Sequence, residues 1–254
     1  MAKTHKNGYL LTLDRGNSAL KADVWSGNTI VETIVMAPSY IYRQLKTLLS
    51  RHEIDGAMYC SVTDDGAQFF SLFDEAGVPF FQFNLDIPIP LAIDYKTRNT
   101  LGVDRIAGAI GAYTLSYGKE LMVIDLGTAI TYDRVTSNGT FIGGNIAPGV
   151  SLRLKALNAF TARLPRVNLE GDVPLWGYDT DTALRSGAIR GIAAEVSYYC
   201  SQLPADSEIF ITGGSAPRIA PYLDMPYTME PHLVPIGLKS CLDKHVLELN
   251  TINS

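Results

Sequence analysis

The chain contains one strand, turn and strand pattern twice, and this repeat is the feature that most constrains its fold. Residues 9–14, YLLTLD, are typical of a buried strand that ends in a carboxylate, and residues 121–125, LMVID, repeat the pattern. Alignment of the turns that follow, DRGNS and DLGTA, carries Val24 onto Val135 without a gap. The sequence therefore predicts an internal duplication with one α/β lobe built around each copy.

Strands and helices alternate through both halves, which favours an α/β fold. Pro38 is typical of a helix start, and Ile41, Leu45, Leu48 and Leu49 follow at helical spacing. Further strands are predicted at 22–25, 30–35, 57–62, 78–83, 131–135 and 208–212, further helices at 68–75, 103–117, 150–160 and 182–202, and an irregular or edge segment at 88–90.

No low-complexity or Pro/Ser-rich linker separates the two halves, so we expect a short hinge near residues 117–119. The predicted lobes are 1–117, with the first DxG turn, and 118–254, with the second.

The composition excludes several classes of protein. A net charge of −5 without a basic run lacks the electrostatic footprint of nucleic-acid binding. Three cysteines without CxxC spacing favour reduced thiols in the cytoplasm. No apolar stretch is long enough for a membrane span or an export signal. We therefore expect a globular cytoplasmic protein that binds neither nucleic acid nor membranes.

Motifs of other enzyme classes are missing. The one Gly-Lys pair, Gly118-Lys119, is followed by Glu120, so no Walker P-loop occurs. The sequence also lacks GxSxG and HExxH, and its four histidines are scattered. Hydrolysis by a serine triad or by zinc is thereby disfavoured.

The two DxG turns are candidate phosphate sites. Glycine lets the backbone approach a ligand, Asn17 and Ser18 can donate hydrogen bonds to phosphate, and Lys21 adds positive charge. Asp14 could face the magnesium ion of a nucleotide. A single DxG is more often only a tight turn, but two copies, facing each other across a cleft, could hold a triphosphate from both sides.

Three further segments have both a functional and a structural interpretation. ITGGS at 211–215 could approach a base or ribose, and GGNIAPGV at 143–150 is expected to be a glycine-rich loop that leads into an anion-binding helix start; each could equally be a turn or cap. In LGVDR, Asp104 could act as a general base and Arg105 could bind a substrate carboxylate. The residues by themselves favour a capping role for Asp104.

Taken together, the motifs resemble those of type III pantothenate kinases, in the same order and spacing over nearly the whole chain. They are DRGNSALK at 14–21, LGVDRIAGAIGAY at 101–113, DLGTAITYD at 125–133, FIGGNIAPGVSL at 141–152 and TGG at 212–214. The resemblance implies two duplicated RNase H-like lobes of the actin, sugar kinase and Hsp70 type, with a nucleotide cleft between the lobes.

The resemblance also implies an activity, the ATP-dependent phosphorylation of the primary hydroxyl of pantothenate to 4'-phosphopantothenate, the first step of coenzyme A biosynthesis. It implies ATP with Mg²⁺ or a similar divalent ion, a monovalent cation (K⁺ or NH₄⁺), and a homodimer.

The motifs carry residue roles over to this chain. Asp104 is implied as the general base, Asp125 as the ligand of the monovalent cation and Thr128 as a nucleotide contact. The phosphate-binding segment is Asp14, Arg15, Gly16, Asn17, Ser18, Ala19, Leu20 and Lys21, and the pantothenate-binding residues are Tyr95, Gly102, Val103, Asp104, Arg105 and Thr180, with Thr182 as an alternative register to Thr180.

One position departs from the pattern, because Arg15 stands where relatives are expected to have an apolar residue. It could extend out of the strand end, contact phosphate or alter nucleotide use. The main alternative function is a non-catalytic transcriptional regulator of the Bvg accessory factor type, and a third is another kinase, for a sugar or for acetate. Retention of Asp14, Asp104, Arg105 and Asp125 favours the enzyme.

Overall fold

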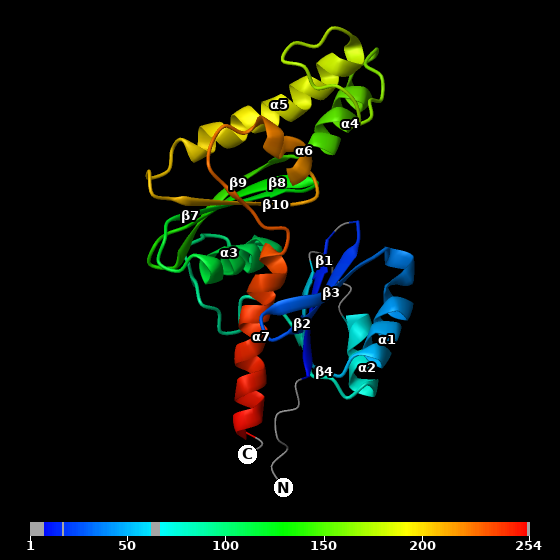
Figure 1. Cartoon of the computed structure of the whole chain (residues 1–254), viewed down its shortest axis with the longest axis vertical. Coiled ribbons are helices and arrows are strands. Elements are labelled where there is room, and N and C mark those ends of the chain that lie inside the picture. The colour runs from blue at the N-terminus through cyan, green and yellow to red at the C-terminus, as the bar shows by residue number, and fades with distance from the viewer. Residues whose placement is uncertain (1–7, 17, 62–66, 253–254) are drawn as a thin grey trace. The chain divides into compact units, whose positions relative to one another are not determined.

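A computed structural model describes residues 8–16, 18–61 and 67–252, which form two compact units (Figure 1). The first unit comprises the described residues up to Leu115 together with those from His232 onward, and the second is Ser116–Pro231. The boundary lies close to the expected hinge. The units differ from the expected lobes in one respect, because the C-terminal helix groups with the N-terminal part of the chain.

The first unit is built on a five-stranded sheet with the order β3-β2-β1-β4-β5. β1 and β3 pair antiparallel with β2, whereas β4 pairs parallel with β1 and β5. The strands are β1 (Tyr9–Arg15), β2 (Leu20–Ser26), β3 (Thr29–Met36), β4 (Ile54–Ser61) and β5 (Phe80–Gln82).

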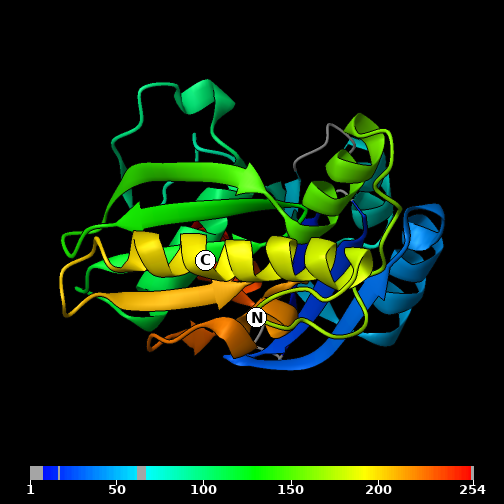
Figure 2. The ribbon, with the colours of Figure 1, turned by 90° about the horizontal axis from the view of Figure 1, so that it is seen from above.

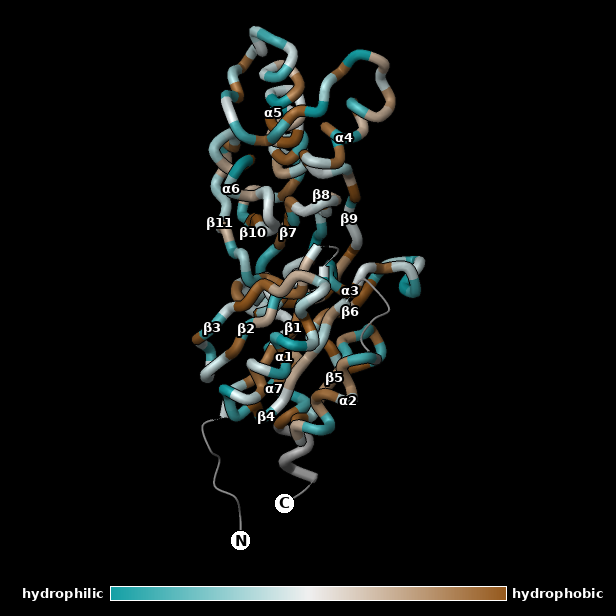
Figure 3. The backbone as a smooth tube through the Cα atoms, turned by 90° about the vertical axis from the view of Figure 1, so that its right-hand side faces the viewer, coloured by the Kyte–Doolittle hydropathy of each residue, from teal (hydrophilic) through white to brown (hydrophobic). Residues whose placement is uncertain are grey.

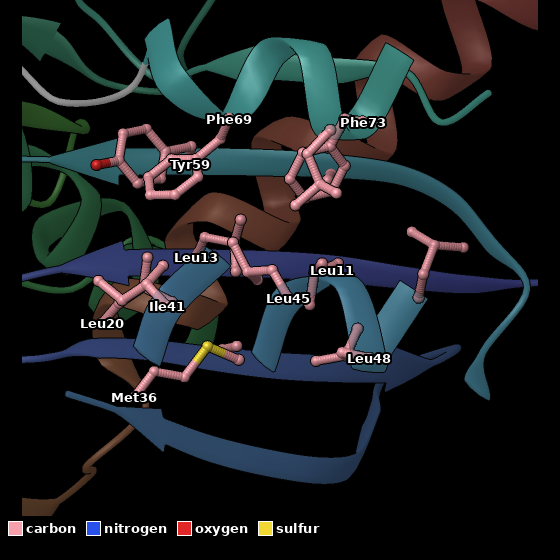
Figure 4. Packing of buried hydrophobic residues seen from close by; sticks show 14 of the residues in the cluster. Leu11, Leu13, Leu20, Met36, Ile41, Leu45, Leu48, Tyr59, Phe69 and Phe73 are labelled. Carbon is pink, nitrogen blue, oxygen red and sulfur yellow. The ribbon is translucent and has the colours of Figure 1, made fainter. Parts of the chain in front are cut away.

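Two helices, α1 (Ile41–Arg51) and α2 (Ala67–Glu75), cover one face of this sheet. Leu11 and Leu13 of β1 point toward them because side chains alternate along a strand, and they pack with Leu45, Phe69 and Phe73 (Figure 4). A 3-10 turn, η1 (Pro38–Tyr40), precedes α1, so the predicted helix start at Pro38 is confirmed.

The opposite face of the sheet is packed against α7 (Leu233–Ile252), which lies beside α3 (Val103–Leu115). Glycines permit the close contact between these helices. A Cβ on Gly111 would overlap the carbonyl of Leu233, and a Cβ on Gly237 would overlap that of Ala107. Between β5 and α3 the chain is largely irregular, with only β6 (Ala92–Ile93) and η2 (Arg98–Thr100).

In the second unit the strand order is β11-β10-β7-β8-β9. β7, β8 and β9 form an antiparallel meander, and β10 is parallel to β7 and β11. The strands are β7 (Leu121–Leu126), β8 (Ala129–Val135), β9 (Thr140–Pro148), β10 (Glu208–Thr212) and β11 (Thr228–Met229).

The long helix α5 (Thr180–Cys200) lies along this second sheet (Figure 2). It buries Ile189, Ile192 and Val196 in one cluster with Met122 and Ile124 of β7. The remaining elements are α4 (Val150–Phe160), α6 (Ala216–Ile219) and η3 (Ala220–Tyr222). Hydrophobic stretches recur along the strands and helices of each unit, as the colours of the trace show (Figure 3).

The predicted repeat is present as two hairpins, β1-β2 and β7-β8, but their turns differ in length. Asp14 pairs with Lys21 in the first hairpin, whereas Asp125 pairs with Thr131 in the second. The second turn is therefore one residue shorter. The gapless alignment is correct for the DxG turn, but in the strand that follows the turn it is out of register by one residue.

The expectation of a glycine-rich loop at 143–150 is also wrong, because most of this segment belongs to β9. A Cβ on Gly144 would overlap the carbonyl of Tyr132 on the neighbouring strand. Glycine here serves the close approach of two strands rather than a loop.

The composition predicts reduced cysteines and no membrane-spanning segment. Cys60, Cys200 and Cys241 are free thiols. None of the helices in the described part of the chain is long and apolar enough to cross a bilayer.

Candidate functional site

The first DxG turn joins β1 to β2 and places Asp14 at the carboxyl end of a central strand. Asp14 stands opposite Lys21 on β2 and Cys60 on β4. The amide of Gly16 donates to the carbonyl of Ala19 at 3.1 Å, which closes the turn. Alternation along β1 points Asp14 away from the α1/α2 core and toward the α7 side of the sheet.

The other residues of this segment have different surroundings. Arg15 is buried and its guanidinium donates to the carbonyl of Gly16, so it braces the turn. Leu20 is a core residue, and Ser18 is exposed. Asn17 lies outside the described residues.

A second group of candidate residues lies at the start of α3. Asp104 is in the first turn of the helix, and its Oδ1 accepts a hydrogen bond from the amide of Arg105 at 3.0 Å. A Cβ on Gly102 would lie 2.5 Å from that same oxygen, so a side chain there would displace the Asp104 carboxylate. The buried guanidinium of Arg105 lies 5.8 Å from the ring centroid of Tyr95, which brings together two of the predicted substrate residues.

Asp104 lies close enough to Asp14 to affect the pKa of Asp14. The pKa of Asp14 is raised to about 6, chiefly because burial disfavours its charged form and next because Asp104 is nearby, while Lys21 partly offsets the effect. The same two carboxylates, after burial itself, raise the pKa of Cys60. Strand β1, helix α3 and strand β4 thus converge on one acidic site in the first unit.

The donor set of this acidic site can be compared with what a metal ion needs. Among the residues that the structure describes, no group of three or more His, Cys, Asp and Glu side chains could hold a metal. Mg²⁺ is commonly bound by one or two carboxylates together with substrate phosphates. Asp14 and Asp104 therefore fit a magnesium ion that arrives with a nucleotide, rather than a closed protein site.

The second DxG turn forms another cluster, within the second unit. Gly213 has a φ of +94°, and a Cβ there would overlap Oδ1 of Asp125. The amide of Gly149, at the start of α4, donates to the carbonyl of Thr128 at 2.9 Å. The turn after β7, the start of α4 and the Gly-Gly turn after β10 therefore lie side by side, with Thr128 exposed.

The second unit also contains a cavity of about 460 Å³ between α4 and α6. Arg218 of α6 donates to the carbonyl of Leu169 at 3.0 Å and to Glu170 at 2.8 Å. Lys155 and Arg166 add positive charge to the lining. The lining thus contains more basic than acidic side chains, and Arg218 follows the Gly-Gly turn by only a few residues.

The two threonines that were alternatives for a substrate contact have different environments. Thr182 is buried and forms a capping box with Asp179, with its amide donating to Asp179 Oδ1 at 2.8 Å. This contact gives Thr182 a structural role. Thr180, the first residue of α5, is exposed.

Sequence reasoning missed Cys60 as a neighbour of the acidic site. Its position could have been inferred only from the parallel pairing of β1 with β4, since strands in parallel register end side by side. No motif marks it, because its proximity to Asp104 is created by tertiary packing.

The fold is shared with several solved structures. A Campylobacter jejuni protein assigned to the Baf family of transcriptional activators superposes with a TM-score of 0.61 at 22% identity, covering 92% of this chain and 98% of that one. A ROK hexokinase from Thermus thermophilus has a TM-score of 0.52 at 14% identity, covering 94% and 99%. MreB5 of Spiroplasma citri has a TM-score of 0.51 at 12% identity, covering 95% and 98%. These similarities establish the actin, sugar kinase and Hsp70 type of fold.

Similarity in sequence is more specific. The family model described as type III pantothenate kinase matches residues 10–202. A type III pantothenate kinase of Porphyromonas gingivalis is 37% identical over 242 residues, 93% of this chain and 98% of that protein. One of Azobacteroides pseudotrichonymphae is 35% identical over 237 residues, 91% and 95% of the two chains. On this match and these identities, the chain belongs to the type III pantothenate kinase family.

Proposed function

We propose that this protein transfers the γ-phosphoryl group of ATP to the primary hydroxyl of pantothenate and releases 4'-phosphopantothenate, the first step of coenzyme A biosynthesis. The observation that carries the proposal is the convergence of Asp14, Asp104 and Arg105 in the first unit. Two carboxylates that share a partly buried site repel each other. A purely structural role would not call for such an arrangement, so it favours a functional one.

In this proposal Asp104 accepts the proton of the pantothenate hydroxyl as the oxygen attacks phosphorus. Asp104 stands in the first turn of α3, close to Asp14. Arg105 and Tyr95 would hold the substrate, with the guanidinium pairing with the pantothenate carboxylate. Positioning and charge neutralisation supply most of the acceleration in phosphoryl transfer, so no covalent nucleophile is needed.

Nucleotide binding is assigned to the two DxG turns. Residues Asp14 to Lys21 would contact phosphate, and Asp14 would face the divalent ion that the nucleotide carries. Asp125 and Thr128 are assigned to the monovalent cation and to the nucleotide, and the cation would add positive charge beside the phosphates. The Gly-Gly turn at Gly213 lets the backbone come close to a ligand, and it is assigned to the adenosine end of ATP.

We also propose that the protein is a homodimer, and the second unit offers a suitable surface. Phe160 and Trp176 are 88% and 84% exposed, and Leu175 and Tyr178 are exposed beside Trp176 in the chain. A groove of about 500 Å³ adjoins Phe160 and is lined mainly by apolar side chains. Apolar surface of this kind is typical of association sites, and a second copy of the chain is the occupant we assign.

A coupled ATPase assay with pantothenate, run with and without K⁺, tests the proposed activity. We expect pantothenate-dependent turnover that falls when K⁺ is omitted. Asp104→Asn should lower kcat by about 10² to 10⁴, the usual contribution of a general base, and keep the same thermal unfolding profile.

Asp74→Asn is a matched control, because Asp74 is an exposed acid on α2, against the opposite face of the sheet. It should leave kcat unchanged. Wild-type turnover in Asp104→Asn would refute the assignment of the base, and absence of any pantothenate-dependent turnover would favour the regulator.

A further inference from the structure

In the second unit, the peptide group that joins Pro148 to Gly149 is held by hydrogen bonds at both of its ends. Its N–H, on Gly149, donates to the carbonyl of Thr128 at 2.9 Å. Its carbonyl, on Pro148, accepts from Nε of Arg153 at 2.8 Å. Because a peptide group is planar, the guanidinium that fixes the carbonyl also fixes the direction of the N–H.

This peptide group lies directly against the second DxG turn. A Cβ on Gly149 would lie 2.2 Å from the carbonyl oxygen of Gly127 and 2.6 Å from that of Thr128. Gly149 is buried, whereas Thr128, the residue assigned to the nucleotide, is exposed. The orientation of the peptide group therefore helps to set the position of the turn that presents Thr128.

Arg153 is in turn held by Glu195 of α5. Its Nη2 donates to Oε2 of Glu195 at 2.6 Å, and the two side chains are only 21% and 27% exposed. A guanidinium carries several donors in one rigid plane, so Arg153 can bind the carboxylate and the carbonyl of Pro148 at the same time.

Tyr132 of β8 holds the other oxygen of Glu195. Its hydroxyl donates to Oε1 of Glu195 at 2.9 Å, and its buried ring packs against that of Tyr199, with the ring centroids 4.6 Å apart. Burial, and next the hydrogen bond to Glu195, raise the pKa of Tyr132, so the hydroxyl stays protonated and remains a donor. Side chains from β8 and α5 thus fix the guanidinium of Arg153.

We propose that Tyr132, Glu195 and Arg153 are positioning residues that orient the peptide group at 148–149 and, through it, the second DxG turn. The kinetic consequence is tighter binding of the nucleotide at Thr128, and it rests on the proposed function. The structural consequence is protection of the Gly149 amide, and it does not depend on that function.

Glu195→Ala tests the proposal with two measurements. We expect KM for ATP to rise at least about fivefold while KM for pantothenate stays within about twofold, since small displacements of positioning groups have large kinetic effects. Hydrogen exchange of the Gly149 amide should quicken, because its hydrogen bond to Thr128 opens more often. Glu195→Gln still offers an oxygen to Arg153 and an N–H group to the hydroxyl of Tyr132, so it should keep both quantities close to wild type.

Arg134→Met is the control for a general loss of stability. Arg134 forms another arginine and glutamate pair of the same unit, with Glu120 at 3.6 Å, at the end of β8 that is far from Thr128. Loss of this pair should change neither KM for ATP nor exchange of the Gly149 amide.

The proposal is overturned if Glu195→Ala leaves exchange of the Gly149 amide or, in an active enzyme, KM for ATP unchanged. It is also overturned if Arg134→Met quickens that exchange equally, or if Glu195→Gln is no closer to wild type than Glu195→Ala. If the wild-type protein does not phosphorylate pantothenate, the proposed function fails and the exchange measurement still decides the positioning role. Should Glu195→Ala not fold, Arg153→Met takes its place in the same measurements.

Discussion

At the scale of residues, the acidic site combines function with a cost in stability. The proposed contact of Asp14 with a metal-bound nucleotide needs the charged carboxylate, yet the surroundings of Asp14 favour the neutral form and raise its pKa to about 6. The folded state therefore binds a proton at Asp14 more tightly than the unfolded chain does. Charged Asp14 destabilises the native protein above this pH, and the destabilisation disappears as the pH falls toward 4.

Asp14→Asn is accordingly expected to stabilise the protein at pH 8 by about 1 to 3 kcal/mol, the lower end reflecting the partial exposure of the carboxylate. The gain should be absent at pH 4, and kinase activity should be lost. Urea unfolding at the two pH values measures both stabilities. A variant less stable than wild type at pH 8 would contradict the raised pKa.

Gly213 packs tightly against the second DxG turn. Its positive φ and its contact with Asp125 both exclude a side chain. Gly213→Ala should destabilise the protein by about 2 kcal/mol and raise KM for ATP. Gly214→Ala is the matched control, because a Cβ there meets open space and the φ is not positive. Equal effects of the two substitutions on thermal unfolding and KM would disprove this explanation.

Only part of the acidic site could be predicted from the residues alone. The order of the motifs identifies Asp14, Asp104 and Arg105 as a set, but the spacing of Asp104 by itself favours a helix cap. Cys60 carries no local signal. Its position beside Asp14 depends on the pairing of β1 with β4, and a single sequence does not contain that information in its periodicity.

At the scale of elements, the sequence predicts best where the local pattern and tertiary packing agree. α4 and β10 have the predicted bounds, because their patterns are uninterrupted. The segment at 143–150 was predicted as a loop because glycine and proline dominate it, whereas pairing with β8 makes most of it a strand. The helix α7 was not predicted. Pro235 and Gly237 in its first turns obscure a helical pattern, although both the proline position and the glycine contact suit this helix.

The glycines between α3 and α7 give a prediction at this scale. Gly237→Ala should destabilise the protein by about 3 kcal/mol or more, because the new methyl group overlaps the backbone of α3. Gly191→Ala in α5 should stabilise it by about 0.5 to 1 kcal/mol, since its Cβ would have only ordinary contact with Arg153 at 3.8 Å. Chemical denaturation should therefore give shifts of opposite sign, and a shift of the same sign would refute the close-packing argument.

At the scale of the whole molecule, both the fold type and the presence of two units follow from the repeated DxG hairpin. The extent of the units does not, because the first unit is assembled from two separate parts of the chain. Hydrophobic periodicity identifies helices and strands, but it does not indicate which of the two units α7 packs against. The exposure of Phe160 and of Trp176 is likewise visible only in the structure.

The proposed homodimer gives the prediction at this scale. Phe160→Glu should convert the dimer to a monomer in light scattering coupled to gel filtration, because a charge would be buried in an apolar contact. Tyr117→Glu is the control, since Tyr117 is 81% exposed but lies outside the segments at 150–160 and 175–178. A dimer that persists in Phe160→Glu, or a wild-type protein of monomer mass, would exclude this surface as the interface.

The return of α7 to the first unit has a consequence for biosynthesis. The ribosome makes the whole second unit after the N-terminal part of the first unit and before α7, so the sheet surface beneath α7 stays bare until that helix is made. Newly made chains should be most vulnerable to proteases and to aggregation during that interval, and a stop codon just before Leu233 should leave the second unit able to fold while the first cannot.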